Sequence, residues 1–376
     1  MKRVFAVTFL NYFVSGGLAL IIPLLLLERN IDLAEIGLVI SVLPLVFLVV
    51  RLLSAALADQ VGWARFYLLL NWPGTLLSTL VYFLANSIPA FLLGKIIEAV
   101  KASSYWAVNR TAIFALSPKQ KAAGATRNAA VLSMSTSIGS AVSGVALAFL
   151  GFARTLSMLL VASVIMVIPA AMLLRAQRPQ ARTGILDAVA LLDPRGKGRA
   201  FWLVALVMMF FSLAFYPLFA LLLPIFMAQQ LGYNYMAIGV AFMLYGLLAA
   251  FVAFSTLRVP LDIRRVVVQS VVALLATFLL AGSGSLFLAL FSALALAEGL
   301  GIGFFESIIA KASRNELTVS VDVGLLHVPM RIAEFASVLV AGFVVQSFGY
   351  MPVFVASGVF FTFFSVFSLF ILKIRM

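Results

Sequence analysis

Long apolar segments follow one another along almost the whole chain, and they constrain its fold more than any other feature. A helix that crosses a bilayer needs about 20 mainly apolar residues. The segments have this length, and they do not alternate apolar and polar residues as the strands of a membrane barrel do. We therefore expect an all-α polytopic membrane protein. The sequence predicts twelve transmembrane helices, over residues 4–27, 34–58, 66–86, 89–115, 127–150, 153–174, 201–228, 234–257, 265–282, 285–310, 321–347 and 350–372.

Composition supports the same class. Of the 376 residues, 64% are hydrophobic and 10% are charged, whereas about 25% of the residues of a typical soluble domain are charged. The chain contains no cysteine and one histidine, so we predict no disulfide, no metal site and no cofactor. No Gly-rich loop ending in Lys-Ser or Lys-Thr is present in the sequence, so we expect neither an enzyme nor an ATP-driven pump.

The net charge of +13 is explained by topology. When the connections between predicted helices are assigned alternately to the two faces, 19 basic residues fall on the side of both termini and only Arg29 and Arg154 on the other. Cytoplasmic loops carry such an excess. We therefore expect a protein of the plasma membrane with both termini in the cytoplasm, some attraction to anionic lipid and no nucleic-acid partner.

A short polar segment between the second and third predicted helices has a looser copy after the eighth. The first copy contains Asp59, Gly62 and Arg65, and the second contains Asp262, Arg264 and Arg265. At a similar offset of about 200 residues, Glu98 matches Glu298 and Gly144 matches Gly342. These matches predict that the chain contains a duplicated six-helix unit.

The duplication implies two similar halves. We expect two pseudo-symmetric six-helix bundles, residues 1–174 and 201–376, joined by a cytoplasmic linker at 175–200. The linker either forms a short helix on the membrane surface or is disordered. Parallel repeats of this kind hold a solute site near the middle of the membrane, where the two halves meet.

The chain resembles the major facilitator superfamily of secondary transporters over essentially its whole length. The family's loop motif, Gly-x-x-x-Asp-[Arg/Lys]-x-Gly-[Arg/Lys]-[Arg/Lys], aligns with residues 55–64. Asp59 and Gly62 are kept, whereas the first glycine is Ala55 and the basic positions are lost, with Arg65 following directly. The resemblance implies that Asp59, Gly62 and Arg65 form a gating loop.

Two further motifs carry the resemblance. A Gly-Arg motif at the start of the family's fourth helix is similar to Gly94–Lys95. A motif of the family's antiporters would fall on residues 135–144, where its proline is absent, which disfavours the drug/proton antiporter branch. The resemblance also implies that helices 1, 4, 7 and 10 surround a central cavity, which would place Glu98 and Glu298 across from each other.

Charged side chains inside the predicted spans are the candidates for function, because each costs about 2.5–3.5 kcal/mol at the bilayer centre. On the fourth helix, Glu98, Tyr105 and Asn109 fall within about 60° of arc, and Lys101 flanks them. This stripe predicts a cavity wall in which Glu98 binds a proton or the solute. The alternative is a structural pair of Glu98 with Lys95 or Lys101.

The tenth and eleventh helices carry the other candidates. Arg331 and Glu334 lie one turn apart on the eleventh helix, where the arginine either binds an anionic group or pairs with the carboxylate. Glu298 is central in the tenth helix. Anionic solutes would suit Arg331 and Lys101.

These features predict a monomeric secondary transporter. It would move a small solute by alternating access, coupled to protons through Glu98, Glu298 or Glu334. The alternatives are an efflux carrier for lipophilic compounds and a sensor or scaffold of the same fold that moves nothing. The buried charges discriminate between them, because a scaffold can pair all of them whereas a carrier must leave one able to titrate.

Overall fold

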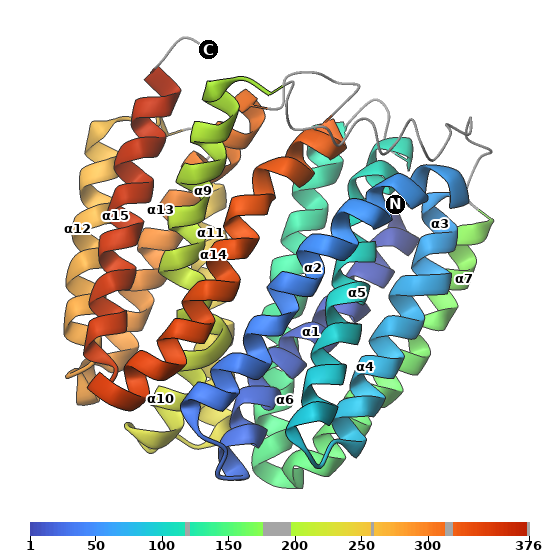
Figure 1. Cartoon of the computed structure of the whole chain (residues 1–376), viewed down its shortest axis with the longest axis horizontal. Helices are drawn as coiled ribbons and strands as arrows, with labels where there is room; N and C mark the ends of the chain where they lie inside the picture. Colours follow the sequence, from blue (N-terminus) through green and yellow to red (C-terminus); the bar gives the residue numbers. More distant parts are fainter. Residues whose placement is uncertain (117–120, 176–196, 257–258, 313–318, 374–376) are drawn as a thin grey trace. The chain divides into compact units, whose positions relative to one another are not determined.

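The computed structural model (Figure 1) describes residues 1–116, 121–175, 197–256, 259–312 and 319–373. The side chains of residues 52, 55–61, 110, 111, 114, 115, 121–126 and 319–323 also lie outside the description. Most of the predicted linker at 175–200 therefore lies outside the described residues.

Helices make up nearly all of the described chain (Figure 1). Those of the first half are α1 (Lys2–Glu28), α2 (Leu33–Val61), α3 (Trp63–Phe66), the π-helical turn η1 (Tyr67–Asn71), α4 (Trp72–Leu84), α5 (Ile88–Leu116), α6 (Lys121–Ile165) and α7 (Val167–Leu174). Those of the second half are α9 (Arg199–Pro217), the π-helical turn η3 (Leu218–Leu222), α10 (Leu223–Gln229), α11 (Tyr235–Ser255), α12 (Ile263–Leu280), the 3-10 turn η4 (Gly284–Leu286), α13 (Phe287–Ala312), α14 (Val319–Phe348) and α15 (Met351–Lys373).

Ten described segments are long and apolar enough to cross a membrane. One of them, residues 127–174, contains Gly151 at φ 74°, where the helix breaks into two. The 29-residue α5 is not among the ten, and it carries the charges of the predicted cavity stripe. The twelve predicted spans are compatible with this arrangement, and the chain is an all-α, integral membrane protein.

The break between α2 and α3 is much shorter than the polar segment that we predicted there. α2 continues to Val61 and α3 begins at Trp63, so that Gly62 alone interrupts the helix. Gly62 has φ 89°, a conformation that costs glycine little and other residues more. One glycine therefore makes the turn, and the polar residues before it stay helical.

The chain divides into two compact units. Unit 1 comprises residues 1–22, 42–193 and 235–240, and in it α4 packs against α5 and α6. Unit 2 comprises residues 23–41, 194–234 and 241–376, and in it α9 packs against α14 and α15, while α12 packs against α13 and α15.

Glycines at repeat-related positions let helices approach closely within each unit. In unit 1, a Cβ on Gly144 of α6 would lie 2.8 Å from the Cα of Gly239 of α11. In unit 2, a Cβ on Gly342 of α14 would lie 3.2 Å from the Cα of Ala34 of α2. Small residues at such crossings are typical of membrane helices, and these two positions are the pair that the sequence repeat matched.

Candidate functional site

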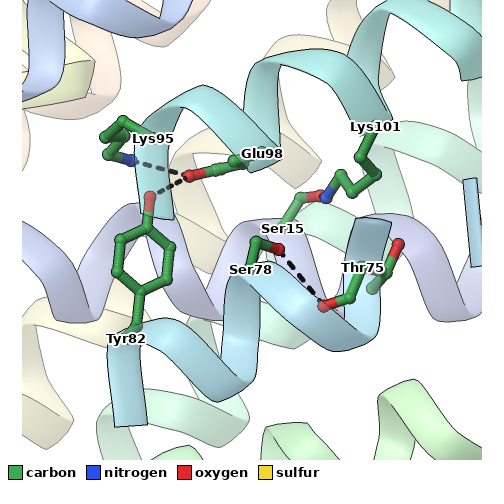
Figure 2. A network of polar contacts seen from close by, with 7 residues as sticks. All are labelled: Ser15, Thr75, Ser78, Tyr82, Lys95, Glu98 and Lys101. Atoms are coloured by element: carbon green, nitrogen blue, oxygen red, sulfur yellow. Dashed lines mark hydrogen bonds and ion pairs between the residues drawn. The ribbon is translucent and has the colours of Figure 1, made fainter. Parts of the chain in front are cut away.

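Glu98 lies in a small cluster between α4 and α5, which we call the α5 ion-pair cluster (Tyr82, Lys95 and Glu98). Lys95 Nζ lies 2.9 Å from Glu98 Oε2, and the Tyr82 hydroxyl donates to the same oxygen at 2.7 Å (Figure 2). The side chains of Lys95 and Glu98 are 5% and 8% exposed. The carboxylate thus has a cation and a hydroxyl donor, both held inside unit 1.

The sequence builds this cluster from two adjacent helices. Lys95 and Glu98 are three residues apart on α5, which brings side chains to the same face of a helix. Tyr82 reaches them from α4 because Gly94 leaves room for its ring. A Cβ on Gly94 would lie 2.7 Å from the Cδ1 atom of Tyr82. The geometry favours a structural ion pair between Glu98 and Lys95, which is one of the alternatives that the sequence allowed.

Lys101 is the second buried cation of α5, and its environment differs. It is 1% exposed, and its Nζ donates to the Ser15 hydroxyl of α1 at 2.6 Å (Figure 2). Its aliphatic stem lies against Gly74 of α4, where a Cβ would approach the Lys101 Cβ to 2.8 Å. Among the described residues no carboxylate forms an ion pair with Lys101.

Polar side chains of the third span, which the sequence analysis missed, lie beside Lys101. Asn71, the last residue of η1, donates to the side chain of Asn11 and to the Lys101 carbonyl, both at 3.3 Å. The Thr75 hydroxyl lies 3.3 Å from the same Asn11 oxygen. Asn71, Thr75 and Tyr82 are spaced by four and seven residues, so helical periodicity could have identified them as one polar stripe.

Tyr105 and Asn109 do not join the α5 ion-pair cluster. The Tyr105 hydroxyl lies 2.9 Å from the Thr8 hydroxyl of α1, and Asn109 accepts a hydrogen bond from the Tyr67 hydroxyl at 2.9 Å. Both side chains are buried. The stripe predicted on the fourth helix therefore divides its contacts among several helices of unit 1.

Glu298 of α13, in unit 2, has a tyrosine partner but no cation. The Tyr245 hydroxyl of α11 donates to Glu298 Oε2 at 2.5 Å. At the repeat offset, the residues matching Lys95 and Lys101 are Ala295 and Gly301. No ion pair to Glu298 occurs within the part of the chain that the structure describes.

The helix around Glu298 is held by tight contacts on several sides. A Cβ on Gly299 would lie 2.6 Å from the Ala249 carbonyl of α11. Arg265 of α12 donates from Nε and Nη2 to the Leu300 carbonyl, at 3.0 and 2.7 Å. The sequence placed Arg265 in the polar segment after the eighth predicted helix, and the structure shows that its side chain is buried and binds α13 two residues beyond Glu298.

Arg331 and Glu334 form an ion pair on α14. Arg331 Nη1 lies 2.5 Å from Glu334 Oε2, and the Ser212 hydroxyl of α9 donates to Glu334 Oε1 at 3.0 Å. The two charged side chains are 17% and 3% exposed. The structure thus joins the two residues that the sequence predicted, with the arginine bound to the carboxylate.

The predicted gating loop is only partly described. Gly62 makes the turn between α2 and α3, and Arg65 is exposed on α3. The side chain of Asp59 lies outside the described residues. In the related segment of unit 2, Asp262 caps α12 by accepting from the Arg265 backbone N–H at 3.1 Å. In the described chain no three His, Asp or Glu side chains group as metal ligands would.

Comparison with known protein families identifies one family. The Major Facilitator Superfamily matches residues 4–314 of the sequence. No curated protein sequence matches the chain.

Three solved structures share the fold over nearly their whole length. The human organic anion transporter MFSD10 (TETRAN) is 19% identical, with TM-score 0.67, covering 99% of this chain and 98% of that one. A bacterial homologue of the human lysosomal transporter Spinster is 15% identical, with TM-score 0.70 and coverage of 99% and 96%. The nucleoside transporter NupG is 14% identical, with TM-score 0.74 and coverage of 100% and 99%. At these identities the likeness concerns the fold.

Proposed function

Because this chain belongs to the major facilitator superfamily, we propose that it is a secondary transporter that couples the movement of a small solute to protons by alternating access. Its charged side chains inside the membrane spans are the groups that would carry the coupling. Their partners differ from one to the next, and this difference supports a role for some of them and not for others.

The observation that carries the proposal is the environment of Glu298. Glu98 and Glu334 each have a cation within 3 Å, whereas the partner of Glu298 among the described residues is the Tyr245 hydroxyl. An ionised carboxylate is expensive inside a membrane, and binding a proton removes the charge. Glu298 is therefore the carboxylate that we propose takes up and releases the coupled proton.

The environment of Lys101 supports the proposal that the solute is an anion. Its ammonium group has three N–H donors, and among the described residues it donates to one side chain, Ser15. A carboxylate or sulfonate of the solute would supply the missing negative charge. Arg331 is less suited to this role because Glu334 already binds it.

The test measures proton flux in proteoliposomes that contain a pH-sensitive dye. Dicarboxylates and sulfonates are supplied outside, because these anions cross lipid bilayers slowly by themselves. Wild-type protein should acidify or alkalinise the lumen when its solute is added. Glu298→Gln should lose at least about 90% of this solute-dependent proton flux, since a neutral amide binds no proton at neutral pH.

Glu98→Gln is the matched control, because it makes the same change at the repeat-related position. We expect this variant to be less stable but still to couple protons once it is reconstituted at equal density. Loss of coupling in Glu98→Gln with normal coupling in Glu298→Gln would contradict the assignment. Absence of any solute-dependent flux in the wild type, across the anion panel, would contradict the proposed anion specificity.

The remaining features are proposed from the sequence. We propose that both termini face the cytoplasm, that the protein acts as a monomer in the plasma membrane, and that anionic lipid binds its basic cytoplasmic face. We also propose that residues 1–174 and 201–376 act as two bundles joined by a linker at 175–200. Asp59, Gly62 and Arg65 would form the cytoplasmic gate.

A further inference from the structure

A hollow of about 780 Å³ opens at one end of unit 2. Its walls come from the connection between α1 and α2, the end of α10, and the connection between α14 and α15, which lies at the lower end of these helices in Figure 1. The volume falls in the range of about 300–1,000 Å³ that is usual for small-molecule sites. None of the charged residues proposed for transport lines this hollow.

Two glutamines in the wall are oriented by hydrogen bonds. Gln346 Oε1 accepts from the backbone N–H of Ala34 at 3.3 Å. Since a backbone N–H can only donate, the amide oxygen must face it and the NH2 group must point elsewhere. Gln229 Oε1 accepts from the Tyr350 hydroxyl at 3.1 Å. Neither NH2 group donates to another described residue, so both donors remain for a ligand.

The rest of the wall adds one carboxylate and one exposed aromatic side chain, Phe348, while the rings of Phe226 and Tyr350 are buried. The Tyr350 ring packs edge-on against Phe226, with centroids 4.9 Å apart. Asp32 contributes a carboxylate, and no lysine or arginine of the described chain lines the hollow. Burial raises the pKa of Tyr350 to about 12, so its hydroxyl stays neutral at physiological pH. The site thus offers N–H donors, a carboxylate acceptor and an apolar ring face.

This combination selects against ions of either sign. An anion would meet Asp32 with no cation to offset the repulsion. A simple ammonium ion would find one carboxylate and would leave the NH2 donors of Gln229 and Gln346 without an acceptor. A hydroxyl group both donates and accepts, and it can bind an amide NH2 and a carboxylate at once. Sugar rings also present C–H faces that pack on aromatic rings.

We propose that this hollow binds a neutral, hydroxyl-rich solute of about disaccharide size. The inference does not depend on proton coupling or on the anion preference proposed above. With both termini in the cytoplasm, the hollow would open on the outer face of the membrane. A solute bound there would contact α1, α2, α10, α14 and α15 of unit 2 together.

The test is titration calorimetry with maltose on the full chain in phospholipid nanodiscs. Alkyl maltoside detergents are avoided because their headgroup is itself a disaccharide. Wild-type protein should give a saturable binding isotherm with maltose, and none with sodium acetate or ethylammonium chloride at the same ionic strength.

The variants separate ligand binding from structural support. Gln346→Glu keeps an oxygen for the Ala34 N–H but replaces the NH2 donor with a second oxygen. Gln346→Met removes the donor without adding charge. Each should weaken maltose binding by about 3- to 10-fold, as expected for one lost hydrogen bond. Asn86→Asp, a matched change at an exposed amide between α4 and α5, should leave the maltose Kd unchanged.

Three results would overturn the proposal. The first is no saturable maltose isotherm with wild-type protein. The second is wild-type maltose affinity in both Gln346 variants. The third is saturable binding of acetate or ethylammonium in place of maltose. Thermal unfolding of each variant in nanodiscs shows whether it is folded, and Gln229→Glu provides an independent donor-to-acceptor change if a Gln346 variant is not.

Discussion

Replacing Lys95 with methionine tests the α5 ion-pair cluster. Lys95 supplies the cation that forms an ion pair with Glu98, and the two side chains are only 5% and 8% exposed. Methionine keeps the length and apolar character of the lysine stem but removes the ammonium group. Glu98 would then retain one donor, the Tyr82 hydroxyl at 2.7 Å.

The expected loss of stability follows from this geometry. Removing one partner of a buried ion pair costs about 3–5 kcal/mol. We expect about 3 kcal/mol for Lys95→Met, because Tyr82 continues to donate to the carboxylate. Glu98→Gln should cost about as much, since it leaves the ammonium group buried. The double variant contains no unpaired charge and should cost only about 1 kcal/mol, because Tyr82 can still donate to the glutamine carbonyl.

The assay is equilibrium unfolding by sodium dodecyl sulfate in mixed micelles, followed by tryptophan fluorescence. The four free energies of unfolding form a double-mutant cycle, and additive effects would give about 6 kcal/mol for the double variant. A buried ion pair between Lys95 and Glu98 is contradicted if the effects add to within about 0.5 kcal/mol, or if Lys95→Met unfolds like the wild type.

Three further predictions follow from single contacts. Gly94→Ala should destabilise the protein by about 1–3 kcal/mol, because the added methyl group would overlap the tyrosine ring of the α5 ion-pair cluster. Gly282→Ala, where nothing lies within 4 Å of the added carbon, is the near-neutral control in the same unfolding assay. Arg331→Met should cost about 3 kcal/mol by leaving Glu334 without its cation, and Arg331→Lys should cost less; equal losses would contradict this. Because burial raises the pKa of Tyr350 to about 12, maltose affinity should be constant from pH 7 to 10, and calorimetry showing a fall within that window would contradict the assignment.

The spans were predictable because the bilayer sets their length. The predicted fourth helix, 89–115, corresponds to α5 at Ile88–Leu116, and the predicted twelfth, 350–372, to α15 at Met351–Lys373. The break between the second and third helices, expected at residues 59–65, was a poorer prediction. Polar residues such as Asp59 end an apolar segment but not a helix, and only the backbone conformation of Gly62 turns the chain.

The sequence did not determine which side chain each buried charged residue would pair with. Periodicity along α5 allowed Glu98 to pair with Lys95 or with Lys101. The fold brings Tyr82 to Lys95 and Glu98 on one side, and it brings Ser15 to Lys101 on another. Spacing within one helix cannot distinguish these cases, because the deciding groups come from other helices.

The class of the protein, the approximate positions of its spans and the presence of costly charges inside them could be read from the amino-acid sequence alone. These properties depend on local composition and on the thickness of a bilayer. The packing of the helices is what places cations beside Glu98 and Glu334 and a tyrosine beside Glu298. Hydrogen bonds and ion pairs form at about 3 Å, and such distances are set by how separate helices pack.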